Sequence, residues 1–338
     1  MNSCSEITAL EGNQMAKKRA KRTGSDGSKR GSRSQANWDA FINGPNTPPE
    51  NNSSEEEPEG DLPEPIDWLD LPSGSTYTDR KAQMSQAEKK AIACYIAQQI
   101  ITDGGSVFFD AGSTLRMIAR ATFARAKKKG LNMIIATNNM DIANDFLSID
   151  EPFSPEQDNL SLQLTGGKHD KQHHALFGDI AAAALDRIWP RIIVMGITGF
   201  SFKQGLFYHG ATEESPIKRA LYTKEVQQRV LAFDHSKLGS PDFFLCTDTN
   251  RDKKSIDLLC EGVSDKTIIV TSMPDMKSAR EKARWDSELK ELESGKLSEL
   301  VRQGRLVMKA VSFDPNPPHY KIDLTIDESG RRSDASKT

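Results

Sequence analysis

The sequence predicts an α/β protein with a mostly parallel sheet that carries helices on both faces, and three observations support this fold class. Short apolar segments alternate with helix-forming segments through the middle of the chain. The apolar segments are flanked by helix-forming segments, as in a parallel sheet that is covered on both faces. Gly, Asn, Ser and Asp residues follow most of these segments. Ligands of such folds bind at the carboxyl ends of the strands, which is where these turns lie.

The individual elements can be assigned in order along the chain. A helix begins near Ser85, places Ile92, Ile96 and Ile100 at helical spacing, and ends at the glycines that follow Asp103. Strands are then expected at 107–110, 133–137, 160–164, 192–196, 230–233 and 267–270. Helices are expected between them at 115–129, 141–147, 175–188 and 214–228.

The composition indicates a chain that is only partly folded. Hydrophobic residues make up 36% of the 338 residues, which is low for a fully globular protein. No apolar run reaches the roughly 18 residues that would span a bilayer, and the N-terminal region lacks the apolar core of a secretory signal. The cysteines are too few and too scattered for a disulfide framework: Cys4, Cys94, Cys246 and Cys260. We therefore expect buried thiols in a cytoplasmic protein.

Both ends of the chain differ from the middle. Residues 1–80 read as a disordered charged tail, with a basic block followed by an acidic, Pro-rich block. The basic block could make weak, salt-dependent contacts with nucleic acid, although solubility is the simpler explanation, and it contains Lys17, Lys18, Arg19, Lys21 and Arg22. We expect a folded body at 81–275, a helix and strand extension at 276–326, and a disordered tail at 327–338. The charged helix at 277–293 could pack on the sheet or on another subunit, but a solvated face is the simpler interpretation.

The most informative segment is the turn after the strand at 107–110. Here Asp110 and Ala111 lead into Gly112, Ser113 and Thr114, and a helix follows directly. The free N–H groups and the positive dipole end of such a helix form a seat for a phosphate or another anion. A plain tight turn is the alternative, because glycine turns between strand and helix are common.

Further turns are expected at the same edge of the sheet. They bring small residues, amide and hydroxyl donors and lysines to one cleft, as a phosphorylated polyol would require. The predicted ligand-binding residues in these turns are Thr137, Asn138, Gly166, Gly167, Lys168, Gly196, Asp234 and Lys237. An exposed surface lysine is the alternative for Lys237, and a cap or an orienting group for Asp234. For Asp110 the alternatives are orienting the phosphate turn and accepting local amide hydrogen bonds, and a structural role is preferred.

Two other polar groups are weaker candidates. His169, His173 and His174 could share a metal ion, but no nearby Cys or paired acid completes a site, so a polar helix entry is preferred. Glu213 and Glu214 precede Ser-Pro and fit a helix start better than an acid/base dyad. We therefore expect no metal, no cofactor and no assigned catalytic residue.

Five stretches of the folded body, taken in order, resemble a known family. They are FFDAGSTLRMIA, IIATNNMDIAN, LTGGKHDKQHHALFGDIA, MGITGFSFKQGLF and EESPIKRALYTKEVQQRVLAFDHSKLG. Residues from about Ala87 to Ser272 are similar to the C-terminal effector-binding domain of DeoR-type transcriptional regulators. The fold of that domain is similar to ribose-phosphate isomerases and glucosamine-phosphate deaminases.

The resemblance implies a sensor of sugar phosphates or related metabolites in a homo-oligomer. It places the Gly112 turn near the phosphate, with Asn138, Gly166, Gly167 and Lys237 in the same cleft. Two departures limit it. The serine- and arginine-rich winged helix-turn-helix of the family is not recognisable before residue 85, which puts direct operator binding in doubt. The segment 168–171 also differs from the family after the paired glycines, which leaves the ligand's identity open.

Two other functions stay open. The first is an isomerase- or deaminase-like enzyme, since the fold relatives act on sugar phosphates; its general base would be Asp110, Asp234 or Glu214. The second is a scaffold whose cleft no longer binds a ligand. No convincing acid/base pair is visible in the sequence, so the sensor is preferred.

Overall fold

One nine-stranded sheet organises the part of the chain that the computed structural model describes, which is residues 85–149, 160–208, 214–241, 244–248, 253–261, 264–315, 318–328 and 333–334. In sheet order the strands are β16 (Ser333–Asp334), β15 (Pro318–Ile326), β14 (Leu306–Pro315), β13 (Ser264–Ser272), β9 (Val226–Phe233), β6 (Ile192–Gly196), β1 (Gly105–Phe109), β2 (Met133–Thr137) and β3 (Leu160–Leu164). All neighbouring pairs from β14 to β3 are parallel, and β15 and β16 pair antiparallel. The predicted mostly parallel sheet is therefore confirmed.

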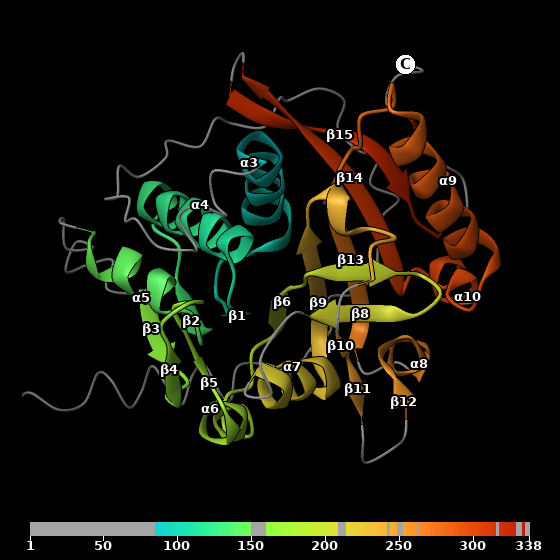
Figure 1. Ribbon diagram of the computed structural model, residues 1–338. Helices are drawn as coiled ribbons and strands as arrows, with labels where there is room; N and C mark the ends of the chain where they lie inside the picture. The colour runs from blue at the N-terminus through green and yellow to red at the C-terminus, as the bar shows by residue number, and fades with distance from the viewer. Residues whose placement is uncertain are drawn as a thin grey trace, which may run out of the picture. The chain divides into compact units, whose positions relative to one another are not determined.

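Helices cover both faces of this sheet (Figure 1). One face carries α3 (Gln86–Tyr95) with its π-helical continuation η1 (Ile96–Ile100), α4 (Ser113–Lys129) and α5 (Met140–Leu147). The other carries α6 (Asp179–Ala184), α7 (Glu214–Thr223), α8 (Ser255–Glu261), α9 (Ala279–Ser294) and α10 (Ser298–Arg302). Alternate strand residues serve the two cores: Phe108 packs in the α7 core and Phe109 in the α4 core.

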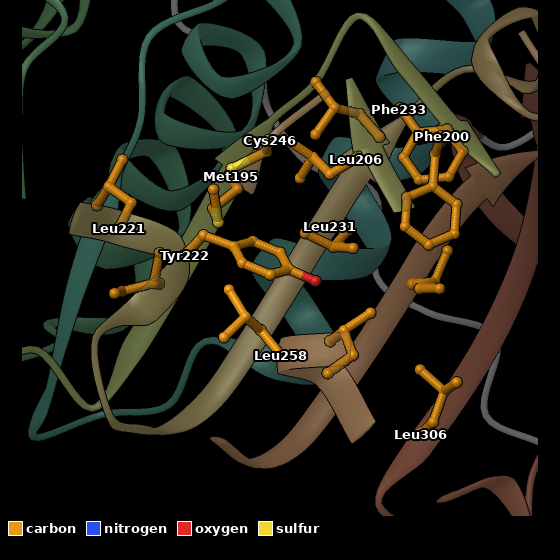
Figure 2. Close-up of a cluster of buried hydrophobic side chains, with 14 of the residues drawn as sticks. Met195, Phe200, Leu206, Leu221, Tyr222, Leu231, Phe233, Cys246, Leu258 and Leu306 are labelled. Atoms are coloured by element: carbon orange, nitrogen blue, oxygen red, sulfur yellow. The ribbon is translucent and has the colours of Figure 1, made fainter. Parts of the chain in front are cut away.

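The larger of the two cores lies beneath α7 and α8. Figure 2 shows part of it. Met195 and Leu231 of the sheet pack with Leu221 of α7 and Leu258 of α8, and all four are almost fully buried. Tyr222 lies among them and donates its hydroxyl to the Ser255 carbonyl at 2.7 Å, so its one polar atom is satisfied. Burying each such apolar side chain stabilises the fold by about 1.5–3 kcal/mol.

Small hairpins lie at the carboxyl edge of the sheet, and the sequence did not predict them. One pairs β4 (Lys168–Asp170) with β5 (Ala175–Phe177). A second sheet contains β7 (Gly199–Ser201), β8 (Gly205–Tyr208) and β10 (Phe244–Leu245), and a short pair joins β11 (Thr247–Asp248) to β12 (Lys253–Lys254). The helix expected at 175–188 is wrong over its first part, because pairing with β4 overrides helix propensity at 175–177 and α6 begins only at Asp179.

The helix expected at 214–228 is also too long, and a buried arginine accounts for where α7 ends. Arg229 of β9 donates to the carbonyls of Leu221, Tyr222 and Lys224 at 3.1, 2.9 and 2.6 Å. These are the carbonyls that a helix leaves without partners at its C-terminus. The guanidinium thus stops α7 at Thr223 and lets β9 begin at Val226, four residues earlier than predicted.

The C-terminal extension belongs to the same sheet. Strand β14 pairs parallel with β13, and α9 buries Trp285, Leu289 and Leu292. The helix has the solvated face that its charges indicated, with Lys282, Asp286 and Lys290 exposed, while its other side packs in the core. Among the described helices, none combines the length and the apolarity needed to cross a bilayer.

Candidate functional site

Helix α4 begins at the turn that the sequence singled out. Gly112 is its N-cap residue, with φ 140° and ψ 155°, a conformation that residues with a Cβ rarely adopt. No side chain caps the helix, and its first turn contains no acidic residue. Ser113 is half-buried and Thr114 is buried, so the turn keeps two hydroxyls beside the first N–H groups. A helix of 17 residues that begins in this way favours an anion at its N-terminus.

Asp110 lies directly after β1 and is fully buried. Its Oδ1 accepts a hydrogen bond from Ala111 N at 2.7 Å, and its Oδ2 accepts one from Gly196 N at 3.2 Å. Lys218 of α7 donates its Nζ to the same Oδ2 at 2.5 Å and to the Gly196 carbonyl at 2.9 Å. These contacts tie the ends of β1 and β6 to α7, so Asp110 fixes the backbone that leads into the Gly112 turn.

Sequence reasoning missed Lys218, although a signal was present. The lysine is only 3% exposed and shares a helix face with the buried residues Ile217, Leu221 and Tyr222. A lysine on an apolar face requires a buried acidic partner, because burying an unpaired charge is costly. Asp110 was the available acid at the end of a neighbouring strand.

The two asparagines after β2 have different contacts. Asn139 caps α5, accepting from Asp141 N at 2.9 Å and Ile142 N at 3.4 Å, and its Nδ2 lies 3.5 Å from the Gly112 carbonyl. Asn138 is fully buried and donates its Nδ2 to the Leu176 carbonyl at 3.3 Å. The Oδ1 of Asn138 is buried and has no hydrogen-bond partner among the described residues. A buried acceptor of this kind usually finds a donor, and a ligand hydroxyl could be that donor.

Thr137 has a structural contact instead. Its hydroxyl donates to the Phe109 carbonyl at 2.7 Å and accepts from Asn139 N at 2.9 Å, which joins the ends of β1 and β2. Gly196, at the end of β6, is held by the Asp110 and Lys218 contacts described above.

The paired glycines after β3 shape the entry to the β4–β5 hairpin. Gly166 and Gly167 have φ values of 73° and 114°. A Cβ on Gly167 would lie 2.7 Å from the Phe177 carbonyl oxygen and 2.9 Å from the Ala181 Cβ. Packing against β5 and α6 therefore accounts for Gly167 without a ligand. Lys168 follows at the start of β4 and is exposed.

Asp234 and Lys237 form a separate group of contacts. Lys237 Nζ lies 3.6 Å from Asp234 Oδ2, and Ser236 donates its hydroxyl to the Asp234 carboxylate. Asp234 follows Phe233 of the α7 core in extended conformation, so its side chain points toward the α3 face, whereas Asp110 points toward α7. Burial alone would raise the pKa of Asp234, but Lys237 and the Ser236 hydroxyl hold it below its ordinary value.

The three histidines lie on the β4–β5 hairpin and not at a helix entry, which corrects the sequence interpretation. His169 is part of strand β4, because its backbone pairs with β5. The Nδ1 of His173 lies 2.9 Å from Asp170 Oδ1, and that of His174 lies 2.9 Å from Asp141 Oδ1. Over the described ranges, no cluster of three or more His, Cys, Asp and Glu residues has the geometry to hold a metal ion.

The cysteines agree with the sequence interpretation as far as the described residues extend. Cys94 and Cys246 are buried, and Cys260 is half-buried. Burial raises the pKa of the Cys94 thiol to about 12, so this thiol stays protonated and unreactive at neutral pH. Cys4 and the basic block of the N-terminal tail lie outside the described residues.

Comparisons with known proteins identify the family. The DeoR C terminal sensor domain matches residues 84–256. The HTH-type transcriptional repressor GlcR of Bacillus subtilis (strain 168) is 30% identical over 188 residues, which cover 54% of this chain and 62% of GlcR. The putative aga operon transcriptional repressor of Escherichia coli O157:H7 is 26% identical over 209 residues, covering 62% of this chain and 69% of that protein. The chain therefore spans less than two thirds of the length of GlcR.

The solved structures that match part of this chain include ribose 5-phosphate isomerase A from Methanocaldococcus jannaschii. It is 16% identical, covers 45% of this chain and 56% of its own, and has a TM-score of 0.31. The family match extends over more than half of the sequence and contains the turns at the ends of β1, β2, β3, β6 and β9. The chain belongs to the DeoR C terminal sensor domain family.

Proposed function

We propose that the chain is the sensor of a transcriptional regulator and that it binds a phosphorylated sugar or a related phosphorylated metabolite. The observation that carries this proposal is the uncapped N-terminus of α4 at Gly112, beside the Ser113 and Thr114 hydroxyls. Such a terminus stabilises a dianion through its N–H groups and its dipole. Membership in a family of effector sensors supports the same reading.

The rest of the ligand would extend from this turn along the carboxyl edge of the sheet. The buried Oδ1 of Asn138 supplies an acceptor for a hydroxyl group, which is the polar contact that a polyol offers and a bare phosphate does not. Gly166, Gly167 and Lys168 would border the ligand from the β4–β5 hairpin. Asp110 and Thr137 would act through the backbone that they hold.

An isomerase- or deaminase-like enzyme has less support. A general base must be free to accept a proton from the substrate. Asp110 is occupied by Lys218 and two backbone N–H groups. Asp234 has a lowered pKa, because Lys237 and Ser236 offset the effect of its burial, so it is a weak base. The contacts of both carboxylates thus favour binding over catalysis.

A thermal-shift screen tests the proposed function. The full-length chain is heated with glucose 6-phosphate, ribose 5-phosphate, glycerol 3-phosphate or inorganic phosphate, and with the unphosphorylated sugars as controls. A ligand at 100 times its Kd adds about 2.7 kcal/mol of stability. Stabilisation by none of the phosphorylated compounds would contradict the proposal, and turnover of the stabilising compound would favour the enzyme.

Paired glycine variants separate a binding defect from a folding defect. Gly112→Ala places a Cβ at φ 140° in the turn before α4, where the phosphate is proposed to bind. Gly104→Ala also adds a Cβ at positive φ, 68°, in a turn before β1 where no atom lies within 4 Å of it. Because this position strains the backbone less than Gly112 does, urea unfolding of both variants reports how much of the Gly112→Ala effect is loss of stability. We expect the ligand-induced shift to disappear in the first variant and to persist in the second.

A further inference from the structure

The first turn of α3 meets the turn after β9 through charges of alternating sign. Glu88 Oε1 lies 3.4 Å from His235 Nδ1. The next helix residue, Lys89, is only 4% exposed and interacts electrostatically with Asp234. The acid Glu88 is thus paired with the base His235, and the base Lys89 with the acid Asp234.

The same turn is held from two further elements. His235 N donates to the Ser272 hydroxyl at the end of β13 at 2.9 Å. The Nε2 of His235 lies 3.3 Å from Glu281 Oε2 of α9, and the His235 carbonyl accepts from Arg284 of that helix at 3.5 Å. Because α3, β13 and α9 all hold His235, a shift of this turn must change the contacts of α3.

Asp234 is the residue that joins this arrangement to Lys237, one of the predicted ligand-binding residues. It is 5% exposed and interacts both with Lys237 on its own turn and with Lys89 on α3. An anion beside Lys237 would compete with Asp234 for the lysine ammonium. Asp234 would then depend more strongly on Lys89, and the docking of α3 would change.

Helix α3 is also where residues 1–84 join the described body. We propose that the turn from Asp234 to Lys237 and the first turn of α3 form a transmission contact. In this contact Glu88 and Lys89 are positioning residues for Lys237. The proposal rests on the proposed function in one respect, because a bound anion is the signal that would draw Lys237 away from Asp234. It deepens that function by naming the path from the candidate site to the N-terminal part of the chain.

Amide hydrogen exchange on the full-length chain without ligand tests the contact itself. We expect Lys89→Met and Glu88→Gln to speed exchange at residues 235–239 by about fivefold or more, relative to wild type. Asp234→Asn should in turn speed exchange in α3. Lys89→Arg keeps the charge and should restore the wild-type rates.

Two controls keep this result interpretable. Gln86→Ala changes an exposed residue on the same helix turn and should leave residues 235–239 unchanged. Exchange at residues 133–137 of β2 reports general loss of stability, and the effect at 235–239 must exceed it. Changes confined to the element that carries each substitution would overturn the proposal.

A second measurement adds inorganic phosphate, the simplest probe for the anion. Exchange in α3 should change by about fivefold in the wild-type chain and stay constant in Lys237→Met. If phosphate stabilises the chain but leaves α3 exchange unaltered, the transmission contact is wrong and the proposed function stands. If phosphate and the phosphorylated sugars all fail to stabilise the chain, the proposed function fails, and the ligand-free variants decide the coupling on their own.

Discussion

Lys218 Nζ lies 2.5 Å from Asp110 Oδ2, and both side chains are buried at the junction of β1, β6 and α7. Lys218 neutralises the negative charge of the Asp110 carboxylate, which would otherwise lie unpaired next to the proposed anion site. It therefore allows a negative ligand at Gly112 without repulsion from Asp110. A buried pair of this kind is costly to break from one side, because the remaining charge loses its partner.

Removing Lys218 alone should be strongly destabilising. We expect Lys218→Met to lower the free energy of unfolding by about 3–5 kcal/mol, because the Asp110 charge stays buried without its partner. Urea denaturation measures this change. The double variant Lys218→Met with Asp110→Asn should recover part of the loss, and equal losses in the single and double variants would contradict the interpretation. Lys296→Met, at an exposed ion pair with Asp257, serves as the control and should have little effect.

The cap that Arg229 forms on α7 gives a second prediction. Its guanidinium is fully buried, and burial lowers its pKa to about 10, which still leaves it charged at neutral pH. Arg229→Met would leave the last carbonyls of α7 without donors, at a cost of about 1–3 kcal/mol for each buried group left unsatisfied. We expect faster amide exchange at the C-terminal end of α7 and weaker ligand binding, since α7 carries Lys218. Unchanged exchange in α7 would refute the capping role.

The sequence predicted the central sheet better than the small hairpins and the helix ends around it. The bounds at 133–137, 160–164 and 192–196 match β2, β3 and β6. Continuous apolar runs identify the buried strands β2 and β6, whereas the edge strand β3 alternates apolar and polar residues. The β4–β5 hairpin was not predicted, since pairing at residues 175–177 depends on a partner strand and not on local propensity. The end of α7 was predicted wrongly because the cap comes from Arg229, a residue beyond the helix.

The candidate site shows the same division. The strand-turn-helix at Gly112 was visible because backbone geometry and residue type are local properties. The assignment of Lys237 to the phosphate stays a prediction, because it depends on side-chain direction, which the sequence does not give; without a ligand, its Nζ lies 3.6 Å from Asp234 Oδ2. The contact of Lys218 with Asp110 could not be predicted, because it depends on α7 lying at the end of β1, which the sequence does not reveal.

The cluster around His235 predicts a dependence of stability on pH. Glu88 raises the pKa of His235 most strongly, burial opposes this, and the Glu281 and Asp234 charges add to the rise. The folded-state pKa therefore lies above the ordinary histidine value of 6.5. The other charged groups near this turn are Lys89, Lys237 and Arg284. A raised folded-state pKa means that the imidazolium stabilises the fold fully below about pH 6.5. This contribution is lost as the pH rises through the folded-state value.

Unfolding free energies measured from pH 6 to 8 check this prediction. Stability should fall across the range more steeply in the wild-type chain than in His235→Gln, which cannot titrate at this position. An NMR titration of the imidazole reports the folded-state pKa directly. Parallel stability profiles for the two proteins, or an imidazole pKa below the ordinary value, would contradict the assignment of His235 as a charged link between α3 and α9.

The last prediction concerns the basic block of the N-terminal tail and its binding to DNA. If the basic block does more than keep the chain in solution, the full-length chain should bind duplex DNA weakly and without sequence preference through Lys17, Lys18, Arg19, Lys21 and Arg22. Each phosphate neutralised should contribute about −0.9 to the slope of log K against log salt concentration. Deletion of residues 1–40 should abolish this binding, and fluorescence anisotropy at several salt concentrations measures both quantities. Because the deletion leaves α3 and the sheet intact, sugar-phosphate binding serves as the folding control. DNA affinity that survives the deletion would assign the nucleic-acid contact to another part of the chain.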